Sequence, residues 1–201
     1  MTVAVAVTKN NRTVLAADSL VNFGGQRFPA ENARFRKIHR VGDSLLAWAG
    51  WSLYGELIHA HLASNQPPEL ISEAQVFDFF IGFWRNIRND YTFSLPQPRE
   101  RNQRHPFADL DSVFLLANRH GIFRIAGDMD VTQFRQYCAV GSGSEYALGA
   151  LRVLYDQHDN PAVIARRSVE IGIDYDVYCD GPIDLDEVES YATEETPEHP
   201  P

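Results

Sequence analysis

The chain has 201 residues, 44% of them hydrophobic, a length and composition that fit one domain with a substantial core. Its net charge of −9 and its lack of a Lys/Arg run argue against a nucleic-acid partner or an anionic membrane surface. The first residues lack the pattern of a secretory leader, and no apolar stretch approaches the roughly 18 residues of a membrane span. We therefore expect a cytoplasmic protein.

The strand patterns come mostly in hairpins. Residues 2–9 alternate between larger and smaller apolar side chains, and Asn10-Asn11 predicts a tight turn into a return strand over 13–17. Such a hairpin would bring Asp18 beside Thr2, because strands of similar length are joined by a short loop. The other expected strands are 36–41, 44–49, 112–117, 122–126, 135–140 and 175–179.

Helical patterns follow in two pairs. The first pair covers 52–63 and 72–87, where Ser72 and Gln75 form a capping box. The second pair covers 145–155 and 161–171, with Asn160 as the N-cap of the latter. Segments 23–34 and 96–106 are rich in turn-forming residues and are expected to be loops.

This order of elements predicts an α+β fold, a four-layer αββα sandwich in which two antiparallel sheets face each other and a helical layer covers each outer side. A doubly wound parallel fold agrees less well, because the strands come in hairpins instead of alternating with helices. We expect one domain over 1–183 and an acidic, proline-ended, flexible tail over 184–201.

The start of the chain is chemically unusual. If Met1 is removed, Thr2 carries both a hydroxyl and a free α-amine, and such an amine titrates near pH 8. The amine could then take the proton of the hydroxyl, so that one residue supplies nucleophile and base. Alone, this observation is weak, since many cytosolic proteins begin Met-Thr.

Five short motifs along the chain occur in an order that is typical of one protein family. They are Thr2-Val3-Ala4-Val5-Ala6-Val7, Val14-Leu15-Ala16-Ala17-Asp18-Ser19, Arg36-Lys37-Ile38, Ala49-Gly50 and Val140-Gly141-Ser142-Gly143-Ser144. From Thr2 to about Asp180 the chain resembles proteasome β-subunits, and most of all the bacterial HslV-like threonine peptidases. The resemblance implies an N-terminal-nucleophile (Ntn) hydrolase that forms homo-oligomeric stacked rings, degrades unfolded polypeptides and can work with a regulatory ATPase.

The resemblance also implies roles for individual residues. Thr2 matches the nucleophile, Asp18 the catalytic aspartate, and Lys37 the lysine that the aspartate holds. Gly50 matches the glycine whose N–H forms the oxyanion hole, and Trp48 the floor of the substrate pocket.

Two further matches lie near the threonine amine in the family. Ser142 corresponds to the serine that hydrogen-bonds there, and Asp176 to the aspartate that orients it. Cys179 stands where a serine is common, and its thiol is a poorer hydrogen-bond partner.

Other interpretations remain open at this stage. Asp18 and Lys37 could be an ordinary ion pair, and the glycine–serine run 141–144 a helix-capping turn. The chain could be an Ntn amidohydrolase acting on small amides, or a catalytically silent structural ring subunit. No cofactor is implied, and His59 and His61, two apart on a helix, point to different faces and do not predict a zinc site.

Overall fold

The structure is a computed structural model of the whole chain, and it describes residues 2–23, 26–28, 32, 35–65, 68–90 and 112–190. Four strands form one antiparallel sheet in the order β10-β1-β2-β11, and five form a second in the order β5-β6-β7-β8-β9. A separate hairpin joins β3 to β4. The strands are β1 Ala4–Lys9, β2 Arg12–Ala17, β3 Val21–Phe23, β4 Gln26–Phe28, β5 His39–Val41, β6 Ser44–Ala49, β7 Val113–Asn118, β8 Gly121–Ile125, β9 Val131–Phe134, β10 Tyr137–Val140 and β11 Asp184–Glu189.

The helices are α1 Leu53–Ser64, α2 Glu73–Asp90, α3 Ser144–Gln157 and α4 Pro161–Tyr175. Ser72 and Gln75 hydrogen-bond to each other at the start of α2, as the capping box predicts. The side chain of Asn160 accepts from the N–H of Ala162 and so caps α4. The two predicted helix pairs are therefore confirmed.

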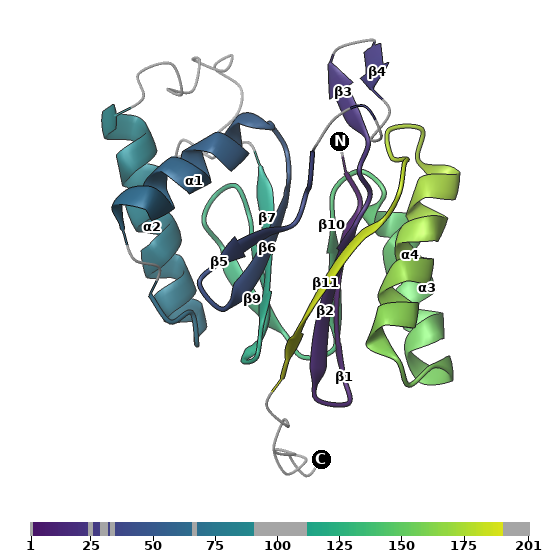
Figure 1. Cartoon of the computed structure of the whole chain (residues 1–201). Helices are drawn as coiled ribbons and strands as arrows, with labels where there is room; N and C mark the ends of the chain where they lie inside the picture. Colours follow the sequence, from purple (N-terminus) through teal and green to yellow (C-terminus); the bar gives the residue numbers. More distant parts are fainter. Residues whose placement is uncertain are drawn as a thin grey trace, which may run out of the picture.

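Figure 1 shows the four layers: α1 and α2, the five-stranded sheet, the four-stranded sheet, and α3 with α4. Three buried apolar clusters separate them, one under each helix pair and one between the sheets. The cluster between the sheets contains many alanines, which let the two sheets approach closely. The predicted αββα sandwich is confirmed.

The first hairpin forms as expected. Asn10 and Asn11 have φ of 51° and 58°, the left-handed values that a two-residue hairpin turn requires. The resulting register pairs Ala4 with Ala17, so Asp18 lies beside the start of β1. The hairpin turn thus brings Asp18 next to Val3, which lies 15 positions earlier in the chain.

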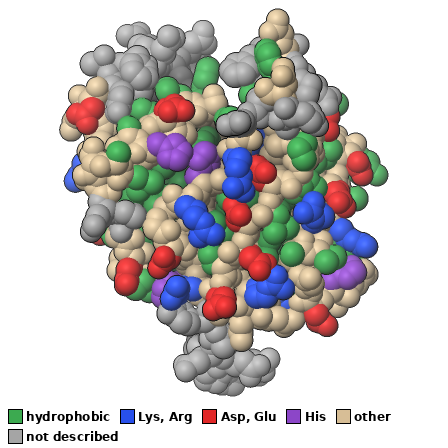
Figure 2. All heavy atoms as spheres, in the orientation of Figure 1, with side chains coloured by type: hydrophobic (Ala, Val, Ile, Leu, Met, Phe, Trp, Pro, Cys, Tyr) green, Lys and Arg blue, Asp and Glu red, His purple; other side chains and the backbone are tan. Residues whose placement is uncertain are grey.

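The end of the chain differs from the prediction. The expected strand at 175–179 is wrong, because α4 continues to Tyr175 and Asp176 forms its C-cap. The strand is instead β11, at 184–189, within the segment expected to be a tail. The acidic composition of this segment predicted a tail and not a strand. In the structure these acidic residues pair with arginines on neighbouring elements. On the face of the molecule that carries β5 and β11, basic side chains (Lys or Arg) lie among Asp and Glu side chains (Figure 2).

Three further strands, β3, β4 and β9, were not predicted. The segment expected as a loop at 23–34 contributes to the β3–β4 hairpin, and β9 is a short strand at the edge of its sheet. The predicted loop at 96–106 lies outside the described residues. Within the described ranges, no helix is long and apolar enough to cross a membrane.

Candidate active site

Thr2 lies at the end of the sandwich where β1 begins, with only 4% of its surface exposed. Its carbonyl accepts a hydrogen bond from the N–H of Gly143, at 3.4 Å. Gly141 has a φ of +98°, and a Cβ on it would lie 2.0 Å from the Thr2 carbonyl oxygen. Only glycine fits this position, because it combines a left-handed backbone with close contact to Thr2.

Asp18 is fully buried and accepts four hydrogen bonds. The Lys37 ammonium donates to it at 2.7 Å and the Val3 N–H at 3.0 Å. The N–H groups of Leu20 and Asp180 donate to its other oxygen, each at 3.2 Å. The structure therefore brings Asp18 and Lys37 into direct contact beside the residue that follows Thr2.

The electrostatics of this pair follow from its burial. Burial raises the pKa of the Asp18 carboxyl, whereas the charge and hydrogen bond of Lys37 and the N–H groups of Val3 and Leu20 oppose the rise. All four neighbours donate, which suits an acceptor-only carboxylate. Lys37 itself is 6% exposed, so each charge depends on the other for its compensation.

Sequence reasoning missed the segment that covers Asp18. Asp180 donates its N–H to Asp18 and its carbonyl accepts from the N–H of Ser19, while the Ser19 hydroxyl donates to the carbonyl of Pro182 at 2.6 Å. A signal was present, because Asp180-Gly181-Pro182 has turn composition and Gly181 has a φ of +88°. That turn leads the chain from α4 back into β11.

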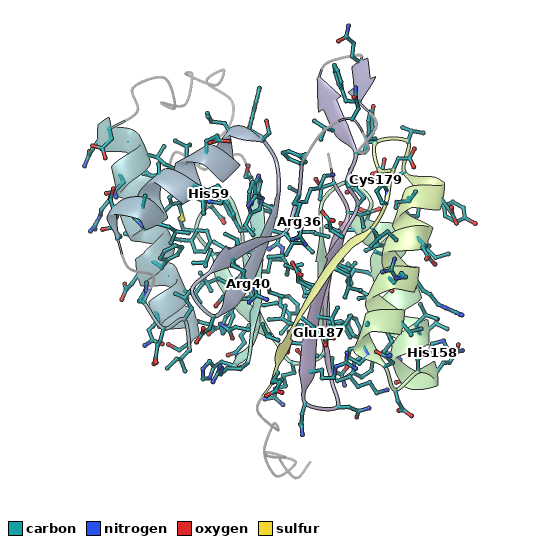
Figure 3. All side chains as sticks on the ribbon, viewed as in Figure 1. Arg36, Arg40, His59, His158, Cys179 and Glu187 are labelled. Atoms are coloured by element: carbon teal, nitrogen blue, oxygen red, sulfur yellow. The ribbon has the colours of Figure 1, made fainter. Side chains whose placement is uncertain are left out.

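A second polar group, formed by Ser142, Asp176 and Cys179, also lies near the start of the chain. Cys179 donates its thiol to Asp176 at 3.3 Å and lies 3.9 Å from the Ser142 hydroxyl. A Cβ on Gly143 would lie 2.9 Å from the Cβ of Val3 and 3.4 Å from the Cys179 sulfur, so this group packs against the start of β1. Figure 3 shows Cys179 at the end of the sandwich where β1 begins.

The charges in this group are ordered by hydrogen bonding. Burial raises the pKa of Asp176, but hydrogen bonds from Ser142, the Tyr178 N–H and Cys179 outweigh it and hold the pKa below its ordinary value. Burial, together with the carboxylates of Asp18 and Asp176, raises the pKa of Cys179 to about 12. Asp176 is thus an anion that holds a neutral thiol and a hydroxyl in place.

Trp48, on β6, and Gly50, just after it, have different surroundings. Gly50 has a φ of +151° and follows Ala49, whose Cβ would lie 3.3 Å from a Cβ on Gly141. Since Gly141 also touches Thr2, the end of β6 lies close to Thr2. Trp48 points to the opposite face of β6 and packs under α1, where it is 6% exposed and its indole N–H donates to the Trp51 carbonyl.

The histidines do not form a metal centre in the described ranges, where no three His, Cys, Asp or Glu side chains are grouped to hold an ion. His59 interacts with His39 on β5 at 3.2 Å, and His61 with Asn86 on α2 at 2.9 Å. Their different partners agree with the prediction that they point to different faces of α1.

Comparison with known proteins gives likenesses along nearly the whole chain. No family model matches it. It is 26% identical over 193 residues to the "ATP-dependent protease subunit HslV" of Hyphomonas neptunium, covering 94% of this chain and 92% of the relative.

Solved structures agree. Thiobacillus denitrificans BPH superposes with a TM-score of 0.83 and 28% identity, covering 93% of this chain and 97% of that one, and it has also been solved in complex with epoxomicin. The eukaryotic HslV of Trypanosoma brucei, at 19% identity, has a TM-score of 0.66, over 93% of this chain and 99% of that one, and shows the common fold. These likenesses confirm the predicted resemblance and fold class.

The burial of the two thiols predicts their reactivity. Burial raises the pKa of Cys138 to about 11 and that of Cys179 to about 12, so at pH 8 the thiolate fraction is on the order of one in a thousand or less. We expect iodoacetamide at pH 8 to leave both unmodified in the folded protein and to alkylate both in denaturant, as measured by intact mass. Rapid alkylation of native Cys179 would contradict the described geometry.

The contact of Gly141 with Thr2 predicts a second outcome. Gly141→Ala should lower the thermal unfolding midpoint, because the left-handed backbone alone costs about 1–3 kcal/mol and the methyl group meets the Thr2 carbonyl. Gly149→Ala is the matched control, since a Cβ there has nothing within 4 Å on α3 and a helical alanine is favoured by about 1 kcal/mol. Equal midpoints for the two variants would rule out the close approach.

Proposed function

We propose that this chain, which resembles HslV along nearly its whole length, hydrolyses peptide bonds through an acyl-enzyme ester on Thr2, inside an assembly of stacked rings. The observation that carries this proposal is the buried Asp18–Lys37 pair, bonded to the backbone N–H next to Thr2. A buried ion pair contributes little to stability by itself, and its position beside a candidate nucleophile favours a role in catalysis.

The nucleophile requires that Met1 is removed, so that Thr2 carries a free α-amine. Near neutral pH a useful fraction of such an amine is neutral and can accept the proton of the hydroxyl. The Lys37 cation, held by Asp18, would favour the ionised hydroxyl and disfavour protonation of the amine. Asp176 and Ser142 would orient the amine.

The reaction then proceeds in two balanced steps. The Thr2 oxygen attacks the peptide carbonyl while the amine takes its proton; the C–N bond breaks, and the leaving nitrogen receives that proton, which leaves an ester on Thr2. Water next attacks the ester carbonyl while the amine takes a proton from it; the C–O bond to Thr2 breaks, the Thr2 oxygen receives that proton, and the acid product leaves.

The oxyanion of each intermediate needs a fixed donor. We assign this role to the N–H of Gly50, whose φ of +151° and position after Ala49 support it. Such a donor stabilises the transition state by about 3–4 kcal/mol. The pocket role that the resemblance implies for Trp48 is not part of this proposal, because its indole packs under α1 on the face of β6 opposite to Ala49.

The proposed assembly and its partners are inferred from the similar proteins. Those proteins are named as ATP-dependent protease subunits, and this chain carries no P-loop motif of its own. We propose that it forms homo-oligomeric rings and receives unfolded polypeptide from a separate ATPase.

Substitution of Thr2 tests the proposed function. Thr2→Ala should abolish cleavage of fluorogenic peptides, because no hydroxyl remains to form the ester, whereas Thr2→Ser should retain measurable activity. The same panel includes small amides, and hydrolysis of those alone would favour the amidohydrolase alternative. A Thr2→Ala protein as active as the wild type would contradict the proposed nucleophile, and a wild type inactive on every substrate would favour a structural ring subunit.

A further inference from the structure

The acidic strand β11 has an unusual face. Side chains alternate along a strand, so Asp184, Asp186 and Val188 share one face, and Leu185 lies on the other. Val188 packs in the cluster between the two sheets, and Leu185 packs toward α3 and α4. Two carboxylates thus occupy the side of β11 that faces the opposite sheet, where apolar side chains are the norm.

Arg36 explains these two carboxylates. Its guanidinium donates to Asp186 at 2.8 Å and lies 3.8 Å from Asp184. The carboxylates are 29% and 25% exposed, so they are more shielded than Arg36, which is 56% exposed. Arg36 comes just before β5, a strand of the other sheet, and Figure 3 shows it between that sheet and β11. The contact therefore joins the two sheets at their edge.

The position of Arg36 in the chain connects this contact to the site. Arg36 directly precedes Lys37, whose ammonium lies on Asp18. On the other side of Lys37, Ile38 is 4% exposed and packs in the cluster between the sheets. The backbone at Lys37 is thus anchored by a buried side chain on one side and by a double ion pair on the other.

The segment that leads into β11 also contacts Asp18, the partner of Lys37. Asp184 pairs with Ala17, the residue before Asp18, and Asp180 donates its N–H to the Asp18 carboxylate. The segment from Asp180 to Asp186 therefore hydrogen-bonds to Asp18 directly and contacts Arg36, the residue next to Lys37 in the chain.

We propose that Arg36, held by Asp184 and Asp186 of β11, is a positioning residue that fixes the backbone beside Lys37 and so keeps its ammonium directed at Asp18 and Thr2. This inference rests on the proposed function. Global stability is a poor explanation for the contact, because exposed ion pairs contribute about 0–1 kcal/mol. A small displacement of a charged group in an active site, by contrast, has a large effect on rate.

The test compares Arg36→Gln, the Asp184→Asn/Asp186→Asn double variant and the combined triple variant. Each should lower kcat on the order of tenfold with KM unchanged, and the triple variant should lose no more than the others, because all three remove one interaction. The acid limb of the kcat/KM profile should move to higher pH, since a displaced Lys37 no longer disfavours protonation of the Thr2 amine. Arg36→Lys should recover part of the loss.

The matched controls are Arg12→Gln and Glu187→Gln. These residues form an ion pair between β2 and β11 within one sheet, on the same acidic strand but without a link to Lys37. Both controls should keep the wild-type kcat and pH profile, and the thermal midpoints of all variants should stay close to that of the wild type.

Two results overturn the positioning role: a wild-type kcat and pH profile in Arg36→Gln, or an equal loss in Arg12→Gln, which would indicate a general effect of β11. Because both are measured against an active wild type, they leave the proposed function standing. A wild type that cleaves no peptide overturns the proposed function and this inference with it.

Discussion

The burial of the Asp18 carboxylate is the constraint on which the rest of the structure depends. A carboxylate with no exposed surface is stable only if donors and a countercharge surround it. These donors come from four places in the chain: the residue before β1, the segment after β2, the segment before β5, and the turn that leads into β11. Correct assembly of the sandwich and assembly of the site are therefore the same event.

The two polar groups beside Thr2 complement each other. In one group Asp18 fixes a buried cation, and in the other Asp176 holds a hydroxyl and a neutral thiol. Glycines at 141 and 143 let the second group approach the first residues of β1 closely. In the proposed mechanism the first group would favour the ionised hydroxyl of Thr2, and the second would orient its amine.

Local chemistry accounts for what could be predicted from the sequence. Asn10-Asn11 specifies a hairpin turn, and that turn alone brings Asp18 to β1; Asn160 likewise marks the start of α4. The Asp18–Lys37 contact, in contrast, was expected only through family resemblance, because the two residues are 19 positions apart and the sequence between them carries no signal for their approach.

The errors arose where partners are distant in sequence. The acidic residues of β11 resembled a disordered tail because their cations, Arg12 and Arg36, lie about 150 or more positions earlier. The alternation at 175–179 resembled a strand, but Val177 is 84% exposed and Asp176 ends a helix. A pattern read along the chain cannot include such contacts, and this is why the segment from Asp180 to Asp186 was missed.

The central claim is that Thr2 is an N-terminal nucleophile with its hydroxyl and amine both free to react. A peptide epoxyketone needs both groups to form its stable adduct, so the direct measurement is tandem mass spectrometry of the tryptic digest after treatment with epoxomicin. The account predicts the adduct on the peptide that begins at Thr2 and ends at Lys9, without Met1. An unmodified Thr2 in protein from which Met1 has been removed, or an adduct on another residue, would contradict it.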